Sequence, residues 1–246
     1  KYDFDISVTD HMLYALAPLP YATGLLPLLL KDEVDVEFLP PVKEAESMSF
    51  KERNVKGFKL GMRKGIEYFF GLGSVTYYVS KSLASMQSSG KSSSLKDKLM
   101  SISPQMMARL LTAKKKCKKE NRELMPKDLF QLKGFMCAGT DNNSYKDDLE
   151  ELWGIRPMEI FAGTEPTCIG TETWTRDGMY FFPDACFYEF LPEYEMNKVD
   201  QDPNYKPRTM LMNEVVTGEL YEIVLTVFKG GAFVRYRVGD MYRCIG

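Results

Sequence analysis

The chain has 246 residues, of which 44% are hydrophobic and 27% are charged. A chain of this length and composition can bury a substantial core, either as one large domain or as two lobes. Its formal net charge of −2, from 32 basic and 34 acidic residues, gives no overall attraction to nucleic acid or to an anionic membrane. We therefore expect neither as a partner, and any polyanionic ligand must be held by local groups.

The cysteine and histidine content argues against a disulfide framework and against a zinc site. The five cysteines are far apart without a C-x-x-C pair, and His11 is the only histidine. The apolar run from Tyr21 to Leu30 is too short for a membrane span and ends at Lys31. The chain opens at Lys1 without the basic-then-apolar order of a signal peptide. We expect a cytoplasmic protein and interpret the chain as the interior of a longer one.

The first forty residues predict a strand, a loop and a helix, which together form a common site-building unit. Met12 to Ala17 is apolar enough for a buried strand, and two prolines beyond it force an extended exit. A helix is expected from Thr23 to Leu30, with Pro27 tolerated only in its first turn. Val34 to Leu39 alternates apolar and acidic residues, which is the period of a half-exposed strand.

Helical periodicity begins after Ser49, which is a plausible N-cap. Apolar residues at steps of three and four predict an amphipathic helix packed on the core: Val55, Phe58, Met62, Ile66 and Phe69. A second apolar stripe runs from Leu72 to Leu83 after a glycine interruption. Ser103-Pro104 opens another helix, whose basic end at Lys114 to Lys119 is expected to be a solvated face.

A serine- and lysine-rich segment, Gln87 to Lys98, has the composition of a phosphate-binding loop. A P-loop requires a glycine five positions before Gly90, and Ser85 occupies that place. The preceding segment also has a helical rather than a strand pattern. We interpret this stretch, including Ser88 to Lys96, as a linker.

The middle of the chain predicts a βαβ unit. Lys133 to Gly139 is a buried strand that runs into a turn, Ser144 caps a short helix, and Pro157 to Phe161 is the next strand. The crossover rule makes the two strands parallel, which brings Gly139 to Asp141 and Gly163 to Glu165 to the same end of the sheet. Each short motif alone is also typical of an ordinary strand-ending turn, but the shared position predicts a site.

The C-terminal third predicts antiparallel strands at Tyr180–Phe182, Ala185–Leu191, Leu220–Phe228 and Phe233–Arg237. Pro192 to Arg208 is predicted to be a polar loop. Gly230 and Gly231 supply the turn of a hairpin, and Asp240 follows its second strand. The chain is thus expected to be α/β over residues 1–175 and antiparallel β over residues 176–246.

Four motifs in this order carry a family resemblance: Phe161–Glu165, Cys186–Pro192, Gly218–Thr226 and Tyr236–Asp240. The chain resembles the auxin-responsive-promoter (Gretchen Hagen) family of acyl-acid synthetases, which belongs to the adenylate-forming superfamily. The resemblance is dense from Gly134 to Gly246. In the earlier part, Pro18–Gly24 is similar to the loop that lines the acyl pocket, and Ala138–Asp141 is similar to the adenine-cradling loop.

The resemblance implies the large N-terminal domain of an adenylate-forming enzyme, with mixed sheets flanked by helices and an antiparallel β region that ends at the hinge. Two parts of the superfamily pattern are absent from the chain. Nothing before Pro18 matches the Ser/Thr/Gly-rich phosphate loop, and the small C-terminal domain with its catalytic lysine would follow Gly246. The chain is therefore interpreted as a central fragment that is inactive alone.

The resemblance also implies roles for individual residues. Thr164 would donate its hydroxyl to the α-phosphate of ATP, and Glu165 would hold Mg²⁺, a hard cation that takes oxygen ligands. Asp240 would accept both ribose hydroxyls. The other nucleotide contacts would come from Gly139, Thr140, Asp141, Ala162 and Gly163, and the walls of the acyl pocket from Leu19, Tyr21, Thr23 and Gly24.

Three implied contacts keep a structural alternative. Phe161 either stacks on adenine or belongs to the core. Arg237 and Arg243 either contact phosphate or pair with acidic residues. The sequence does not decide between these interpretations.

The implied reaction is activation of a small carboxylic acid by ATP to an acyl-adenylate, with transfer to a thiol such as coenzyme A or to an amine. Catalysis would come from in-line placement of the two anions and from charge neutralisation, rather than from acid–base work by the lone histidine. The alternative is a non-catalytic nucleotide-binding or scaffold domain derived from this fold. The acid, the acceptor and the oligomeric state are not specified by the sequence.

Overall fold

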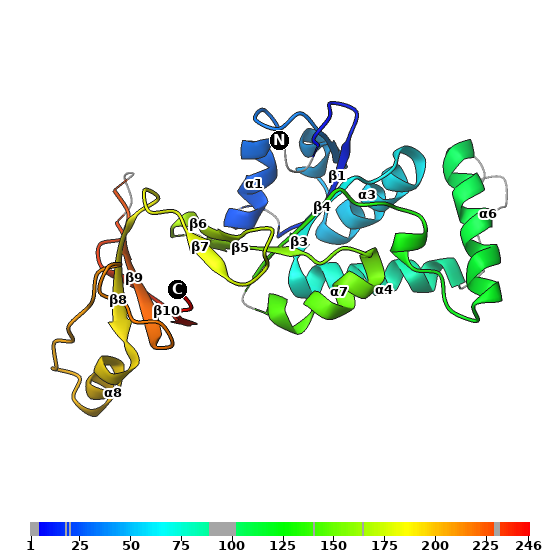
Figure 1. The fold of residues 1–246 in the computed structure, drawn as a ribbon. Coiled ribbons are helices and arrows are strands. Elements are labelled where there is room, and N and C mark those ends of the chain that lie inside the picture. Colours follow the sequence, from blue (N-terminus) through cyan, green and yellow to red (C-terminus); the bar gives the residue numbers. More distant parts are fainter. Residues whose placement is uncertain are drawn as a thin grey trace. The chain divides into compact units, whose positions relative to one another are not determined.

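The computed structural model describes residues 5–17, 19, 21–88, 102–139, 141–163, 165–228 and 232–246. The chain divides into two compact units, Lys1–Ile160 and Phe161–Gly246. The first unit contains β1 (His11–Ala15), α1 (Ala22–Leu30), β2 (Glu37–Leu39), α2 (Val42–Ala45), α3 (Phe50–Lys64), β3 (Tyr68–Leu72), α4 (Gly73–Ser88), α6 (Pro104–Lys119), η1 (Pro126–Asp128), β4 (Gly134–Ala138), η2 (Asn142–Ser144) and α7 (Lys146–Trp153) (Figure 1). Strand β5 (Met158–Gly163) crosses the boundary between the units.

A mixed sheet with the order β2-β1-β3-β4-β5-β6-β7 contains five parallel strands, β1 to β5. Strands β6 (Thr167–Glu172) and β7 (Met179–Phe181) pair antiparallel. A separate antiparallel sheet has the order β10-β9-β8. The predicted fold class, mixed sheets flanked by helices with an antiparallel C-terminal β region, is confirmed.

The central strands of the first unit are buried on both faces, as is usual for a parallel sheet covered by helices. Along β1, Leu13 and Ala15 belong to one apolar cluster, whereas Met12 and Tyr14 belong to another. Helices α3, α4, α6 and α7 contribute to the first cluster, and α1 and α2 contribute to the second. The alternation of side chains along a strand thus distributes the core between two layers.

The predicted helix after Ser49 is shorter than its apolar stripe. Helix α3 ends at Lys64, and Gly65 has a positive φ of 110° that stops it. Ile66 and Phe69 therefore lie outside the helix, contrary to the prediction. Residues 68–72 form β3, the strand between β1 and β4, which the helical spacing concealed.

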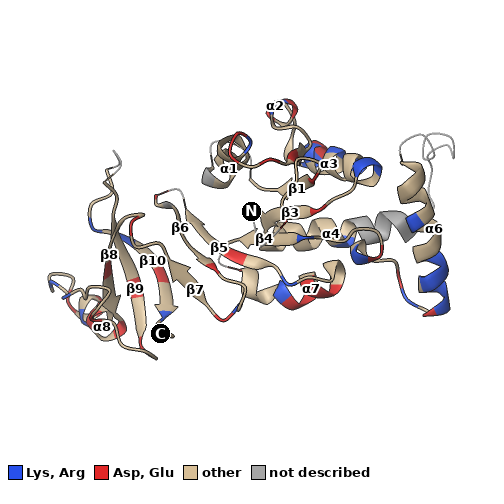
Figure 2. Ribbon diagram, turned by 45° about the horizontal axis from the view of Figure 1, so that its top comes forward, with Lys and Arg blue, Asp and Glu red and all other residues tan. Residues whose placement is uncertain are grey.

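Two predicted helix starts are confirmed by side-chain caps. Ser49 forms a capping box with Glu52 at the start of α3, and the Ser103 side chain accepts a hydrogen bond from the backbone N–H of Met106 at the start of α6. Helix α1 begins at Ala22, so Pro27 lies beyond its first turn, which differs from the prediction. The basic end of α6 is exposed apart from the buried Cys117 (Figure 2).

The βαβ prediction is confirmed, because β4 and β5 are parallel neighbours on either side of α7. The predicted cap of the helix is wrong: Ser144 belongs to the 3₁₀ helix η2, and Tyr145 is the N-cap of α7. Gly154 closes α7 in the left-handed conformation with a φ of 76°. Strand β2 covers only Glu37–Leu39, and its burial is not the alternating pattern that the sequence predicted.

The second unit contains β6, β7, β8 (Phe187–Pro192), α8 (Glu193–Gln201), β9 (Leu220–Thr226) and β10 (Tyr236–Arg243). Helix α8 occupies the segment that was predicted to be a polar loop. Its buried Glu195 accepts hydrogen bonds from Lys198 and Tyr205. These contacts stabilise a helix in a polar sequence. Strand β10 is longer than predicted and includes Asp240; the glycine turn at 230–231 lies outside the described residues.

Within the described ranges, no helix is long and apolar enough to cross a membrane.

Candidate functional site

The strand order reverses at β1 and β3, which favours a ligand site at the carboxyl ends of these strands. Strand β1 has β2 on one side and β3 on the other, so the chain leaves this point of the sheet in opposite directions. In open α/β sheets, ligands bind outside the carboxyl ends of the strands at such a reversal. The segments that follow these ends are Leu16–Tyr21 after β1 and the start of α4 after β3.

A pocket of ≈ 110 Å³ lies beside the end of β1. Leu19 and Gly24, two of the four predicted acyl-pocket residues, line it. The other lining residues are Tyr14, Pro27, Leu28, Val42, Ala45, Glu46, Met48 and Arg53. Thr23 and Tyr21 are not among them, and the Tyr21 residue is 62% exposed. A pocket role for these two residues stays a prediction.

Arg53 and Tyr14 supply the buried polar groups of this pocket. The sequence analysis did not identify Arg53. Arg53 donates through Nη2 to the carbonyl oxygen of Leu16, at the end of β1. Its guanidinium lies 5.6 Å from the centroid of the Tyr14 ring and 5.5 Å from that of Phe50. Burial lowers the pKa of Arg53 and raises the pKa of Tyr14 to about 12.

The predicted adenine loop follows β4. Gly139 has a positive φ of 122°, which explains a glycine at this turn. Asp141 is exposed, and Thr140 lies outside the described residues. The next residue, Asn142, is buried, and neither atom of its side-chain amide has a hydrogen-bond partner among the described residues. The sequence analysis did not identify Asn142, because asparagine in a polar turn carries no distinct signal.

Phe161 lies in an aromatic cluster of the second unit. Its ring meets Tyr242 edge-on, with 5.5 Å between the ring centroids, and Phe181 at 6.4 Å. These rings border the apolar core formed by β8 and β9. The partly buried position agrees with the core interpretation, and stacking on adenine stays a prediction. Ala162 and Gly163 complete β5, and Thr164 lies outside the described residues.

Two of the four motifs that carry the sequence resemblance, Phe161–Glu165 and Tyr236–Asp240, meet in the second unit. The hydroxyl of Tyr236 donates a hydrogen bond of 2.9 Å to Oε1 of Glu165. This hydrogen bond raises the pKa of Tyr236, since ionising the phenol would place a second negative charge beside the carboxylate. The hydrogen bond holds the Glu165 side chain against the start of β10, although 71 positions separate the two residues.

Asp240 lies on a β-bulge. Arg237 pairs with Val224 and Met241 pairs with Glu222, so residues 238–240 lie opposite Ile223 alone. Gly239 has a positive φ of 88° at the centre of the bulge. In the described part of the chain, the partly buried Asp240 carboxylate has no hydrogen-bond or ion-pair partner. Bulges beside active sites redirect a side chain in this way.

Glu222 fastens the bulge and explains the position of Arg237. The Glu222 residue is 1% exposed and accepts hydrogen bonds from Nε of Arg237 at 2.9 and 3.0 Å, from its Nη2 at 2.5 Å, and from the N–H of Gly239 at 3.1 Å. Arg237 thus makes the acidic pair that the sequence kept as one of two alternatives. Arg243 donates to the carbonyl oxygen of Gly218 at 2.6 Å. Phosphate contact by either arginine stays a prediction.

Glu165 fits the way that proteins hold Mg²⁺ with a nucleotide. Among the described residues, no group of three or more His, Cys, Asp or Glu side chains forms a metal cage. Magnesium is usually held by one or two carboxylates together with phosphate oxygens and water. A single partly exposed carboxylate is therefore a suitable ligand, and Tyr236 occupies one of its oxygens.

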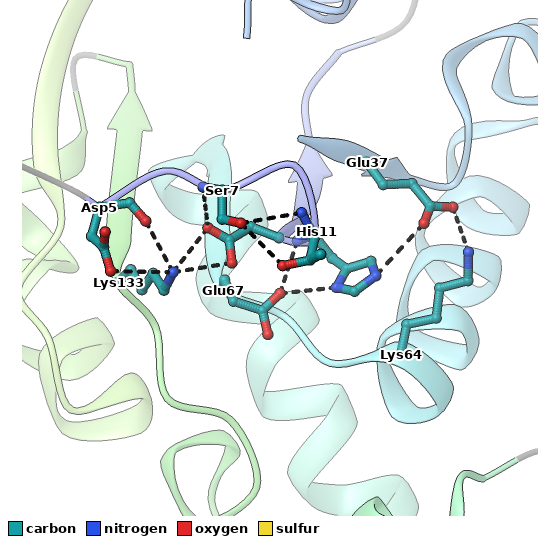
Figure 3. Close-up of polar contacts among 9 residues, drawn as sticks. Asp5, Ser7, His11, Glu37, Lys64, Glu67 and Lys133 are labelled. Carbon is teal, nitrogen blue, oxygen red and sulfur yellow. Dashed lines mark hydrogen bonds and ion pairs between the residues drawn. The ribbon is translucent and has the colours of Figure 1, made fainter. Parts of the chain in front are cut away.

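His11, the single histidine, lies at the amino ends of the parallel strands, opposite their carboxyl ends. Nδ1 of His11 lies 2.9 Å from Oε2 of Glu67, and Nε2 lies 3.6 Å from Glu37, which also pairs with Lys64 (Figure 3). His11 begins β1, so the network joins the amino ends of the strands. This position agrees with a mechanism that does not use the histidine as acid or base.

Two solved structures share the fold of this chain. A solved structure titled AtGH3.15 acyl acid amido synthetase in complex with 2,4-DB matches with a TM-score of 0.60 and 17% identity, over 98% of this chain and 46% of that one. A second, titled GH3.15 acyl acid amido synthetase, matches with a TM-score of 0.61 and 16% identity, over the same shares. At this identity the match establishes the fold, and the chain spans less than half of either protein.

A family model matches the C-terminal part of the chain. Residues 179–246 match the family model described as GH3 family central domain, so the Gretchen Hagen resemblance is confirmed. The matched segment includes Glu222, Tyr236 and Asp240. A comparison with curated protein sequences gives no match.

Proposed function

We propose that the complete protein activates a carboxylic acid with ATP and then transfers the acyl group to an amine or a thiol. The hydrogen bond between Tyr236 and Glu165 carries this proposal, because it joins two motifs whose assigned roles concern one nucleotide. The family match and the fold supply further support.

In the proposed reaction, a carboxylate oxygen of the acid attacks the α-phosphorus of ATP. The bond to the β-phosphate breaks, and pyrophosphate leaves with its electron pair. Gly139 and Asp141 would contact the adenine, Asp240 would accept the ribose hydroxyls, and Thr164 would donate to the α-phosphate. Magnesium, when bound at Glu165, would supply charge neutralisation on the phosphates.

The second half-reaction would be attack of a nucleophile on the acyl carbon, with release of AMP. The matched structures are named amido synthetases, which supports an amine as acceptor; coenzyme A is the other acceptor consistent with the adenylate-forming superfamily. All five cysteines are free thiols, which supports a cytoplasmic protein.

Pyrophosphate exchange in the complete protein tests the first half-reaction. Asp240→Ala should raise the KM for ATP about ten- to hundredfold, because contacts to ribose stabilise substrate and transition state alike. Glu165→Gln should mainly lower kcat, because a magnesium ligand acts as charge develops on the leaving pyrophosphate. Single-turnover reactions with coenzyme A or a set of amino acids would identify the acceptor.

Wild-type exchange in both variants would contradict the adenylating function. The protein would then be better described as a binding or scaffold domain derived from this fold. Tyr236→Phe offers a further check: it removes the hydroxyl that holds Glu165, and a kcat decrease smaller than that of Glu165→Gln is expected.

A further inference from the structure

The small pocket beside β1 contains a buried guanidinium without a carboxylate partner. Arg53 is 7% exposed, and its side chain forms no ion pair among the described residues. Its contacts are the carbonyl oxygen of Leu16 and the ring faces of Tyr14 and Phe50, and its Nε has no hydrogen-bond partner in the part of the chain that the structure describes. A buried charge is normally paired, and the guanidinium therefore has donors that suit an anion.

Tyr14 adds a second donor in the same pocket. The residue is 2% exposed, and no described residue forms a hydrogen bond with its hydroxyl. Tyr14 and Arg53 both line the pocket, together with apolar side chains from α1 and α2. A guanidinium and a hydroxyl surrounded by apolar walls are donors suited to a carboxylate on an apolar stem.

The rest of the pocket has one acidic residue. Glu46 also lines the pocket, but its side chain is exposed, and among the described residues it forms no ion pair with Arg53. The positive charge of Arg53 is therefore not neutralised by the pocket itself. Among the described residues, the basic end of α6 has no comparable buried donor.

We propose that Arg53 and Tyr14 bind a carboxylate group of a small organic acid in this pocket. The inference rests on the proposed function, in which this acid is the substrate. It adds the side chains that would select the acid. The planar guanidinium can donate two parallel N–H bonds to the carboxylate, and the Tyr14 hydroxyl can donate a third. The carboxylate is either the one that is activated or a second one at the far end of the acid.

Binding of three acids to the complete protein, measured by calorimetry, tests the proposal. The probes are acetate, benzoate and glutarate, each compared with its neutral amide. We expect at least one acid to bind and its amide to bind at least tenfold more weakly. Arg53→Met should weaken the binding of that acid about ten- to hundredfold, and Tyr14→Phe should weaken it about two- to tenfold.

The control variant is Lys59→Met, which removes the same charge from an exposed position of α3 and should leave binding unchanged. Circular dichroism and thermal unfolding establish that each variant is folded. If Arg53→Met does not fold, Arg53→Lys retains the charge without the fork and should still weaken binding severalfold. If Arg53→Met weakens the binding of glutarate alone, Arg53 binds the second carboxylate of a diacid. If it weakens the binding of all three acids, Arg53 binds the carboxylate that all of them share.

Equal binding of acid and amide, wild-type affinity in folded Arg53→Met, or no binding of any of the three acids would overturn the proposal. Pyrophosphate exchange separates this failure from failure of the proposed function. Exchange with an unchanged KM for the acid in Arg53→Met would leave the adenylating function intact and refute the pocket. Binding that depends on Arg53 without any exchange would support the pocket and refute the adenylating function.

Discussion

Two arginines of this protein lie in opposite environments. Arg237, on the bulge of the second unit, has a half-exposed guanidinium that binds the buried carboxylate of Glu222. Arg53, in the pocket of the first unit, is itself buried and has no acidic partner among the described residues. A paired charge of this kind stabilises a local structure, whereas an unpaired buried charge costs free energy unless a ligand binds it. The comparison therefore separates an arginine that positions the site from one that is available to a substrate.

The largest expected effect on stability comes from breaking the Arg237 pair. Arg237→Ala would leave the Glu222 carboxylate buried with only the N–H of Gly239 as donor. We expect the free energy of unfolding to fall by about 2–3 kcal/mol, somewhat below the range for fully buried pairs because the arginine is half-exposed. Urea denaturation measures this change.

Arg243→Ala is the matched control, because Arg243 lies on the same strand and makes one hydrogen bond to a carbonyl oxygen. A loss of less than about 1 kcal/mol is expected there. Unchanged stability in Arg237→Ala, combined with weaker ATP binding, would instead identify Arg237 as a phosphate ligand.

The first unit also contains a paired buried charge, Asp10, which can be compared with the unpaired Arg53. The Asp10 carboxylate lies 3.0 Å from Nζ of Lys133 and accepts the N–H of Ser7 at 2.9 Å. The Asp10 residue is 5% exposed, so Asp10→Ala should lower the free energy of unfolding by about 2 kcal/mol. Because this pair lies before the amino end of β1, binding of a carboxylate in the Arg53 pocket should not change.

The exposed Asp32 provides the control for this substitution. Its carboxylate is 79% exposed and lies 3.7 Å from Lys31, so Asp32→Ala should change stability by no more than about 0.5 kcal/mol. Chemical denaturation of both variants at one salt concentration makes the comparison. Equal losses would show that Asp10 contributes no more than a surface charge.

The pH dependence of stability tests a third paired carboxylate. Hydrogen bonds from Arg122 lower the pKa of Asp128 to about 2. A lowered pKa in the folded state gives stability that is present above the unfolded value of 3.8 and is lost as the pH falls through about 2. Roughly 1–2 kcal/mol should therefore disappear between pH 4 and pH 2.

The Asp128→Asn variant removes this titration. Its free energy of unfolding should be lower than that of the wild type at pH 7, and the difference should shrink as the pH falls towards 2. Urea unfolding at a series of pH values gives both curves. Parallel curves would show that Asp128 has an ordinary pKa in the folded protein.

Sequence reasoning predicted the parts of the fold that have local causes. The caps at Ser49 and Ser103 and the βαβ unit around α7 were found because a few neighbouring residues determine them. Strand β3 was missed because its apolar residues continue a helical spacing, and only Gly65 marks the change. Helix α8 was missed because its polar sequence is fixed by contacts of Glu195.

In the candidate site, too, the sequence predicted what depends on local segments and missed what depends on tertiary packing. Motif order identified Glu165 and Asp240, since both belong to short segments with a distinct composition. The partner of Arg237 could not be chosen, because a strand pairing brings Glu222 to it across the sheet. Arg53 lies in an amphipathic helix, where an arginine normally faces solvent. Its burial depends on the tertiary packing of β1 and α3, which no local pattern contains.

The smallest expected effect comes from the helix cap that precedes Arg53. The Ser49 hydroxyl accepts a hydrogen bond from the N–H of Glu52, and the N–H of Ser49 donates one to the Glu52 carboxylate. Ser49→Ala removes the side-chain half of this capping box and should lower the free energy of unfolding by about 1 kcal/mol. Arg53 lies one turn inside the same helix end, so fraying there would also loosen the guanidinium.

Ser103→Ala is a matched control, since Ser103 caps α6 through the N–H of Met106 and lies far along the chain from the pocket. Both variants should lose about the same stability by urea denaturation. Only Ser49→Ala should also weaken the binding of the acid that depends on Arg53, by a few fold. Equal binding in the two variants would show that Arg53 is held by its contacts with Leu16 and Tyr14 alone, so that the start of α3 contributes to folding but not to recognition.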